Sequence, residues 1–204
     1  MLHGRIVRPS AVGAKLASVD ESSVKDIPGL LKVIVKGNFV GVVCEREEQA
    51  IRAARDLKVT WQEPRALPPM SELYDALKKI PSNDRSPANS GDVDAALAGA
   101  AKKLNATYRS PYQTHGSIGP SCGLASVKDG EATIWSGTQG AHQMRPTIAQ
   151  LLGISPASVR VIFVDASGCY GHNGADDAAG DAAILSQAIG KPVRVQWMRH
   201  DEHG

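Results

Sequence analysis

Three glycines spaced three residues apart make residues 167–174, SGCYGHNG, the segment of this sequence best suited to hold a ligand. Gly168, Gly171 and Gly174 have no side chain, so backbone N–H groups beside them can approach a bound group closely. The spacing differs from the G-x-G-x-x-G of dinucleotide sites and from a phosphate loop ending in Gly-Lys-Ser/Thr. It favours an anionic or oxygen-rich ligand, while a strand-to-helix turn without a ligand remains the alternative.

The elements around the glycine segment are expected to be a strand and a helix. The β-branched run 159–164 predicts a strand, and the alanine-rich run 175–189 predicts a helix that ends before Gly190 and Pro192. The start of that helix would direct the positive end of its dipole at the segment. Residues 192–197 then alternate as a further strand, which gives a βαβ-like order.

Two further polar segments could carry chemistry. Residues 108–122 contain His115 and Cys122, and residues 135–143 contain Gln139. A Cys/His hydrolase using Cys122 or Cys169 is one reading, but no thiol-enzyme motif is present, and a crossover loop is favoured. The amide of Gln139 can donate to an oxo or carbonyl oxygen, or Gln139 is only a loop residue.

The rest of the chain reads as an α/β unit, a proline-rich linker and a second region. The first 63 residues alternate between strand and helix patterns, and residues 63–92 form the linker. Expected strands cover 5–7, 15–19, 31–36, 39–44, 57–61, 104–108 and 132–136, and expected helices 45–56, 71–79, 91–97 and 143–152, the last ending at Gly153.

The composition excludes several classes of protein. The net charge of +2 over 204 residues and the scattered basic residues argue against a nucleic-acid-binding protein. No apolar run is long enough to cross a membrane. Cys44, Cys122 and Cys169 are too few and too uneven for a disulfide framework, a structural zinc site or an iron–sulfur cluster within this chain. Because the sequence stops just after an expected strand, we expect a fragment of a longer polypeptide.

Several segments together resemble, in order, the molybdopterin-binding large subunit of the xanthine oxidase/aldehyde oxidase family. Within that family they are similar to the bacterial isoquinoline- or nicotinate-oxidising type. The matching segments are 2–9, 19–20, 27–30, 91–96, 136–142, 159–161, the glycine segment, 192–194 and 199–202. The resemblance implies an α/β (α+β) fold. Residues 1–84 would be an α/β hammerhead domain with its linker, and residues 85–204 the first, incomplete part of a molybdopterin-binding α/β domain.

The resemblance also implies roles for particular residues. Gln139 matches the glutamine that hydrogen-bonds an oxygen ligand of molybdenum. Tyr170 and Gly171 match the Phe-Gly pair of the usual G-G-F-G-G loop, whose backbone lies against the metal centre, and Gly168 and Cys169 adjoin them. No side chain here is expected to bind the metal directly. The cofactor would be molybdopterin, expected as its cytosine dinucleotide, although the fragment itself is not required to bind it.

The implied reaction is hydroxylation of an N-heterocycle or an aldehyde, with the oxygen taken from water. Electrons would leave through the pterin to a small partner subunit with [2Fe–2S] clusters. The family's catalytic glutamate lies beyond this chain, so the fragment is expected to be inactive alone. A different reading is a non-catalytic subunit-assembly module with a vestigial loop. The compartment stays open between cytoplasm and periplasm.

Two departures from the family pattern bear on the substrate. His172, Asn173 and Gly174 stand where the usual loop has a glycine, a basic and an acidic residue. Residues 118–120, Ile-Gly-Pro, stand where many relatives have Met-Glu-Pro. Both departures argue against purine oxidation. They also make His172 a candidate to face the substrate.

Overall fold

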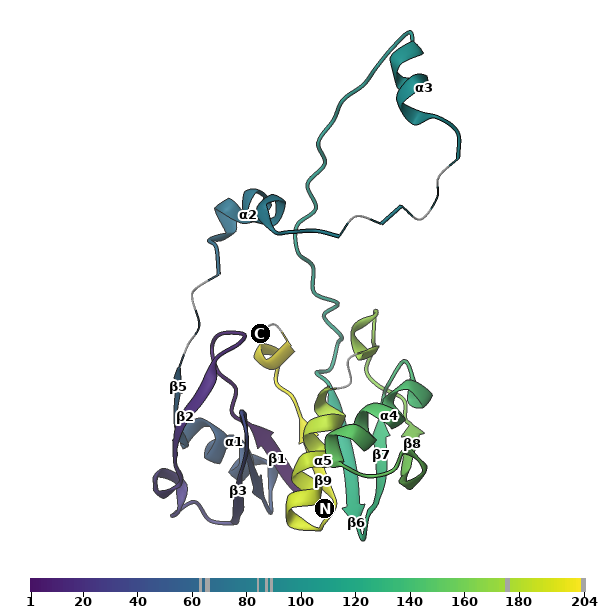
Figure 1. The fold of residues 1–204 in the computed structure, drawn as a ribbon. Coiled ribbons are helices and arrows are strands. Elements are labelled where there is room, and N and C mark those ends of the chain that lie inside the picture. The colour runs from purple at the N-terminus through teal and green to yellow at the C-terminus, as the bar shows by residue number, and fades with distance from the viewer. Residues whose placement is uncertain are drawn as a thin grey trace. The chain divides into compact units, whose positions relative to one another are not determined.

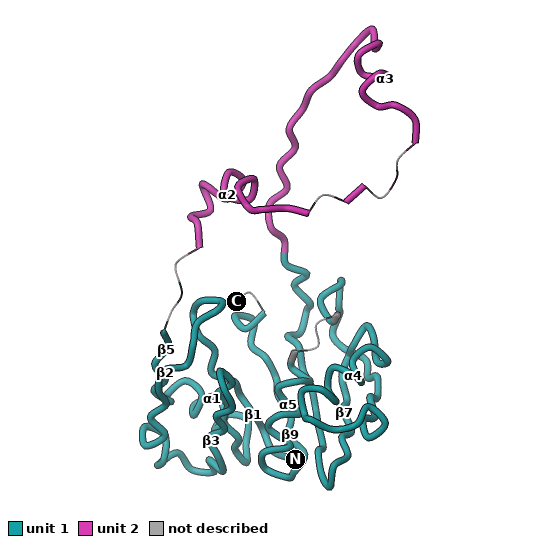
Figure 2. Tube along the Cα trace, viewed as in Figure 1, with its two compact units in different colours: residues 1–64, 114–204 teal, residues 65–113 magenta. Residues whose placement is uncertain are grey.

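The computed structural model of the chain describes residues 1–62, 64, 67–83, 85–86, 88, 90–174 and 177–202. The chain divides into two compact units, residues 1–64 with 114–204 and residues 65–113 (Figure 2). Among the described residues, no helix combines the length and the apolar character needed to cross a membrane.

A seven-stranded mixed sheet organises the first unit, in the order β3-β4-β1-β9-β6-β7-β8 (Figure 1). The two ends of the sequence meet at its centre, because β1 pairs in parallel with β9. This arrangement confirms the expected α/β fold class. The strands are β1 (Leu2–Ile6), β3 (Leu30–Lys36), β4 (Phe39–Cys44), β6 (Cys122–Lys128), β7 (Glu131–Ser136), β8 (Val159–Phe163) and β9 (Val193–Gln196).

Helices pack on both faces of this sheet, and the pattern of β4 shows why. Alternate residues of a strand point to opposite faces. Val40, Val42 and Cys44 join the core of α1 (Glu47–Asp56), whereas Val43 joins the core of α5 (Asp177–Ile189). The apolar run 39–44 was therefore predicted correctly as a strand, and the structure shows that it is buried on both sides. α4 (Ala141–Leu152) packs beside α5 and ends at Gly153, in the left-handed conformation (φ 69°) that the sequence predicted for a C-cap.

Small residues let α5 lie close to the middle of the sheet. A Cβ atom at Gly123 would lie 2.5 Å from Cα of Ala179, and one at Gly4 would lie 2.3 Å from a methyl group of Leu185. Gly123 has no room for a side chain, and at Gly4 the Leu185 side chain would have to move to accept one. This close packing fixes the direction of α5, and hence the place of the glycine segment before it.

A two-stranded sheet completes the first unit. In it, β2 (Lys15–Asp20) pairs antiparallel with β5 (Lys58–Gln62). Trp61 and Val19 pack against the core of α1. Short 3-10 helices lie in the connections of this unit: η1 (Glu21–Val24), η3 (Pro156–Ser158), η4 (His172–Gly174) and η5 (Arg199–Glu202).

The second unit contains η2 (Met70–Glu72), α2 (Leu73–Lys79) and α3 (Val93–Gly99). The carboxylate of Asp92 caps α3 by accepting from the backbone N–H of Ala95 at 2.9 Å. The predicted strand over 104–108 is wrong. Leu104 is fully exposed, and no strand of the described chain pairs with this segment. A segment without a neighbouring strand to pair with leaves its backbone hydrogen-bonding groups to water.

The strand β6 was missed by the sequence analysis, which treated the region before residue 122 as a loop and did not assign residues 122–128. Its inward positions are Gly123, Ala125 and Val127, and a sequence of such small residues lacks the bulky alternation typical of strands. The compact units also fall elsewhere than the expected boundary between residues 84 and 85, because the β1–β9 pairing joins both ends of the chain. The division into two family domains at that boundary stays a prediction.

Candidate functional site

Four connections of the sheet meet at one edge, and three of them carry the segments singled out in the sequence. β7 and β8 run parallel, so the segments after Ser136 and after Phe163 leave the same edge. β6 is antiparallel to both β7 and β9, so the loop that enters β6 and the segment that leaves β9 lie there too. Four segments therefore lie at this edge of the sheet: residues 114–121, 137–140, 164–174 and 197–202.

Hydrogen bonds join the Gln139 segment to the glycine segment. The backbone N–H of Gln139 donates to the carbonyl oxygen of Asn173 at 3.1 Å. The side-chain amide of Asn173 donates back to the carbonyl oxygen of Gly137 at 2.8 Å. These two bonds fix the distance between the two segments. They use the backbone N–H of Gln139 and the carbonyl and side-chain amide of Asn173, groups that the sequence analysis did not single out.

The loop before β6 contacts the other side of the glycine segment. The hydroxyl of Ser117 donates to the carbonyl oxygen of Cys169 at 3.3 Å. The His115 ring lies so close to Gly171 that a Cβ there would be 2.8 Å from its Cε1. The ring centroids of His115 and His172 are 6.4 Å apart. The two polar segments of the sequence analysis therefore both adjoin the glycine segment.

The backbone of the glycine segment is unusual at three positions. Gly168 and Gly171 have φ of 107° and 98°, which only glycine adopts readily. Tyr170, with a side chain, has φ of 52°, a left-handed conformation that costs about 1–2 kcal/mol. Residues held in such conformations concentrate at functional sites. The Tyr170 side chain is 59% exposed, so core packing does not account for its conformation.

A cavity of about 770 Å³ opens at this edge. Gly168 and His172 line it, whereas Gln139, Cys169, Tyr170 and Gly171 lie outside its lining. The structure thus brings the six candidate residues into one neighbourhood but places only two of them on the cavity wall. The remaining lining residues are Met1, Gly119, Pro120, Ser121, Cys122, Leu124, Trp135, Ser136, Gly137, Val164, Asp165, Ala166, Ser167, Asn173, Ala178, Ala179, Arg194, Gln196, Trp197 and Met198.

The Gln139 side chain is available to a ligand. It is exposed, and within the described residues its amide makes no hydrogen bond. α4 starts two residues later, with Gly140 as N-cap and no side-chain cap. An uncommitted amide at the start of a helix, held in place by its own backbone N–H, can donate to an oxygen of a bound group.

The environment of the Cys122 thiol does not support its use as the nucleophile of a thiol hydrolase. Neighbouring protein atoms desolvate the Cys122 thiol and raise its pKa, and the smaller opposite effect of Arg194 does not reverse this. Burial raises the pKa of Cys44 to about 11. A nucleophilic cysteine needs a lowered pKa, because the thiolate is the reactive form. Within the described part of the chain, no group of three His, Cys, Asp or Glu residues could hold a metal ion.

Glu202 is a residue of this site that sequence reasoning missed. Its side chain is only 3% exposed, and its Oε1 lies 3.9 Å from Nε2 of His172. The sequence segment 199–202 was noted only for its order in the chain. No local pattern signals that a carboxylate will be buried against a loop that lies thirty residues earlier in the sequence.

The comparisons with known proteins identify the family. The family model described as "Molybdopterin cofactor-binding domain" matches residues 77–203. The chain therefore belongs to the molybdopterin cofactor-binding domain family, as its resemblance predicted.

Among curated relatives, the chain is 47% identical to a nicotinate dehydrogenase subunit of Pseudomonas putida, over all of this chain and 18% of that protein. It is 26% identical to the beta subunit of isoquinoline 1-oxidoreductase of Brevundimonas diminuta, over 99% of this chain and 27% of that protein. The chain thus spans less than a third of either relative.

Solved structures show the same fold. Quinoline 2-oxidoreductase from Pseudomonas putida 86 superposes with a TM-score of 0.77 at 18% identity, over 99% of this chain and 31% of that one. Aldehyde oxidoreductase from Desulfovibrio gigas superposes with a TM-score of 0.76 at 20% identity, over 97% of this chain and 27% of that one.

The residues at the sheet edge fit one side of a molybdopterin cofactor. Gly168 lines the cavity, and both Gly168 and Gly171 have positive φ values and no Cβ, with the rings of Tyr170 and His115 beside them. The uncommitted amide of Gln139 is a donor suited to an oxygen-rich group. The donor set consists of amides and backbone N–H groups, which suits contact with the organic and oxygen atoms of the cofactor more than direct ligation of a metal.

Proposed function

We propose that the protein containing this chain hydroxylates an N-heterocycle or an aldehyde at a molybdopterin centre, with water as the oxygen source. The observation that carries this proposal is the hydrogen-bonded pairing of the Gln139 segment with the glycine segment, through Gln139 and Asn173. In a chain of the molybdopterin cofactor-binding domain family, this pairing places the side-chain amide of Gln139 beside the backbone of the glycine segment. When bound, the cofactor supplies the two-electron redox chemistry of the reaction.

Five residues of this chain would hold the cofactor: Gln139, Gly168, Cys169, Tyr170 and Gly171. Gln139 would donate a hydrogen bond from its amide, and the other four would present backbone. Fixed donors of this kind orient and polarise a bound group without needing to reorganise. We propose the cytosine dinucleotide form of molybdopterin. This chain would form one wall of the site and be inactive alone, because it holds no match to the family's catalytic glutamate.

The substrate class we favour is an aromatic N-heterocycle. The relative with 47% identity is named as part of a nicotinate dehydrogenase, and a second relative as part of an isoquinoline 1-oxidoreductase. His172 lines the cavity at the point where the sequence departs from the purine-oxidising pattern. Its imidazole would face the substrate. Both relatives are named as subunits, which supports a small partner subunit whose [2Fe–2S] clusters take the electrons.

The test uses the full-length protein together with its partner subunits. Metal analysis should find molybdenum in near-equal amount to the large subunit. Dye-linked assays should then show oxidation of nicotinate or another pyridine-type heterocycle, with ¹⁸O from labelled water in the product. An assembled protein that carries no molybdenum would refute the proposal, whereas oxidation of xanthine in preference to the heterocycles would refute the substrate class.

A further inference from the structure

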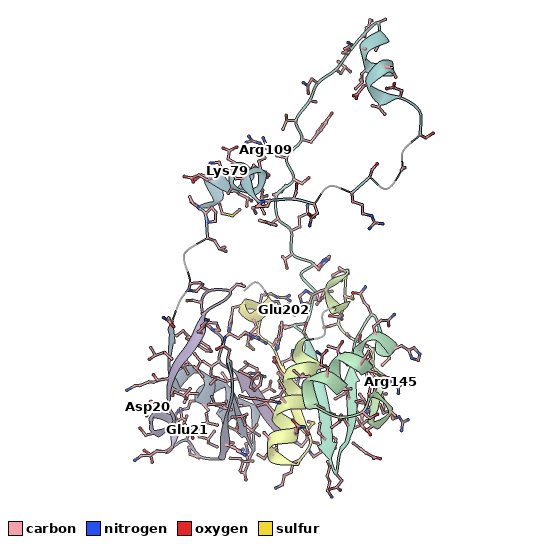
Figure 3. The ribbon with its side chains drawn as sticks, viewed as in Figure 1. Asp20, Glu21, Lys79, Arg109, Arg145 and Glu202 are labelled. Atoms are coloured by element: carbon pink, nitrogen blue, oxygen red, sulfur yellow. The ribbon has the colours of Figure 1, made fainter. Side chains whose placement is uncertain are left out.

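A buried carboxylate behind the cavity wall is unexplained by the proposed roles of the glycine segment. Glu202 belongs to η5, which follows β9, and Figure 3 labels it at the end of the chain that lies beside the sheet edge. Its side chain is 3% exposed, whereas acidic side chains are almost never fully buried unless they are paired. Its partners therefore indicate what it holds.

Three donors fix the Glu202 carboxylate on two sides. The backbone N–H and the hydroxyl of Ser121 donate to Oε1, at 2.6 and 2.9 Å. Nη1 of Arg199 donates to Oε2 at 2.6 Å. Nη2 of Arg199 in turn donates to the carbonyl oxygens of Ser117 and Ile118. The carboxylate is thus tied to both ends of the segment 117–121, immediately before β6.

Among the described residues, the carboxylate has one further ion-pair partner, His172, at 3.9 Å from Oε1 to Nε2. The His172 side chain is 24% exposed and lines the cavity. His115 is the other ring beside it, and His115 is itself exposed. Asp165 and Arg194 also line the cavity, but no ion pair among the described residues joins either of them to His172.

We infer that Glu202 is a positioning residue, which holds the His172 imidazole at the wall of the cavity. The carboxylate is held in place by the backbone N–H and hydroxyl of Ser121 and by Arg199, which is itself anchored to two backbone carbonyl groups. It therefore acts as a fixed point against which the imidazole rests. The role of His172 toward a substrate rests on the proposed function, whereas its positioning by Glu202 does not.

The experiment measures how freely the His172 ring reacts in the full-length protein. Carbethoxylation by diethyl pyrocarbonate at one fixed pH is followed by trypsin digestion and mass spectrometry. The tryptic peptide 161–194 contains His172 as its only histidine, and the peptide 110–128 contains only His115. Each ring is thus measured separately in the same sample.

Glu202→Gln should accelerate the labelling of His172 by about fivefold, because the imidazole then loses the charged carboxylate that holds it in place. Labelling of His115 should stay the same. Asp201→Asn is the matched control, because this neighbouring carboxylate bonds the backbone N–H of Met198 and does not contact His172. An unchanged rate at His172 in Glu202→Gln would overturn the inference, as would an equal acceleration in Asp201→Asn or at His115.

Ser121→Ala provides a second route if Glu202→Gln does not fold. This change removes one hydrogen bond that fixes the carboxylate and leaves its charge in place. A smaller acceleration at His172, about twofold, is expected, and an unchanged rate would again overturn the inference. The labelling requires neither molybdenum nor turnover, so its result is separate from that of the proposed function. Where turnover is present, Glu202→Gln should raise KM for the heterocycle more than it lowers kcat, at unchanged molybdenum content.

Discussion

At the scale of single residues, the site depends on side chains that hold backbone in place and on one side chain left uncommitted. Asn173 and Ser117 donate to backbone carbonyl groups on either side of the cavity edge. Among the described residues, Gln139 is bonded only through its backbone, so its amide remains available. This difference separates residues that shape the site from the residue expected to contact the cofactor.

Replacing Gln139 with Ala distinguishes an active cofactor site from an assembly module with a vestigial loop. The backbone bond to Asn173 would remain, so we expect unchanged folding and molybdenum content. Losing one preorganised donor should lower kcat of the full-length enzyme by about a hundredfold to a thousandfold. Steady-state kinetics with an N-heterocycle check this expectation. If activity is unchanged, Gln139 has no role at the cofactor and the assembly reading gains support.

A second prediction at this scale concerns the ion pair between Arg5 of β1 and Glu47 of α1. Arg5 is buried, and its Nη2 lies 2.8 Å from Oε1 of Glu47, which Arg194 also contacts at 3.2 Å. Glu47→Gln leaves Arg5 without a full counter-charge. Because the Glu47 side chain is 37% exposed and partly screened, we expect a loss of only about 1–2 kcal/mol at pH 7.

The pH dependence of that loss follows from the pKa of Glu47. Burial alone would raise this pKa, but the hydrogen bond from Arg5 and the charge of Arg194 lower it overall. The unfolded chain then binds a proton more readily, so the stabilisation is present above pH 4.5 and is lost as the pH falls below it. Urea unfolding should show a smaller difference between Glu47→Gln and the parent chain at pH 4 than at pH 7. Glu48→Gln, at an exposed neighbour, should match the parent chain at both pH values.

At the scale of elements, the close packing of α5 on β6 positions the glycine segment. β6 has glycine and alanine on its inner face, and the helix backbone occupies the space that side chains would need. The sheet edge and the start of the helix are therefore held at a fixed separation. Movement of α5 away from β6 would displace the whole segment 168–174.

Gly123→Ala tests this packing. The added methyl group would meet the backbone of Ala179, so we expect a loss of about 1–3 kcal/mol in the free energy of unfolding. The matched control is Gly180→Ala on α5, where the new Cβ would make ordinary contact with Leu151 at 3.5 Å. The control should be neutral or more stable by about 0.5–1 kcal/mol, since alanine favours a helix. Equal unfolding midpoints for the two variants would contradict the packing argument.

At the scale of the whole molecule, the chain consists of one compact unit built from residues 1–64 and 114–204 and a second unit of residues 65–113. The second unit has no buried hydrophobic residue among its described positions. It contributes α2 and α3, whose polar and apolar faces are both exposed. The first unit contains all the candidate site residues.

Limited trypsin digestion should show this organisation. We expect the first cuts after Lys102, Lys103 and Arg109, which are exposed, while Arg5 and Arg194 in the central strands resist. The fragments should stay associated in gel filtration, because β1 and β9 pair across the cut. Separation of the fragments without denaturant would show that the seven-stranded sheet is not the stable core.

The amino-acid sequence by itself determined most local elements and the family. The apolar run 39–44, the alanine-rich helix and the helix ending at Gly153 each follow from short-range patterns, and ordered motifs indicated the molybdopterin-binding family. Only the tertiary structure decided that β6 exists, that the segment 104–108 is not a strand, and that Glu202 lies against His172. These features depend on partners far apart in the chain. A strand is stable only where another strand accepts its hydrogen bonds, and a carboxylate is buried only where donors from other segments surround it.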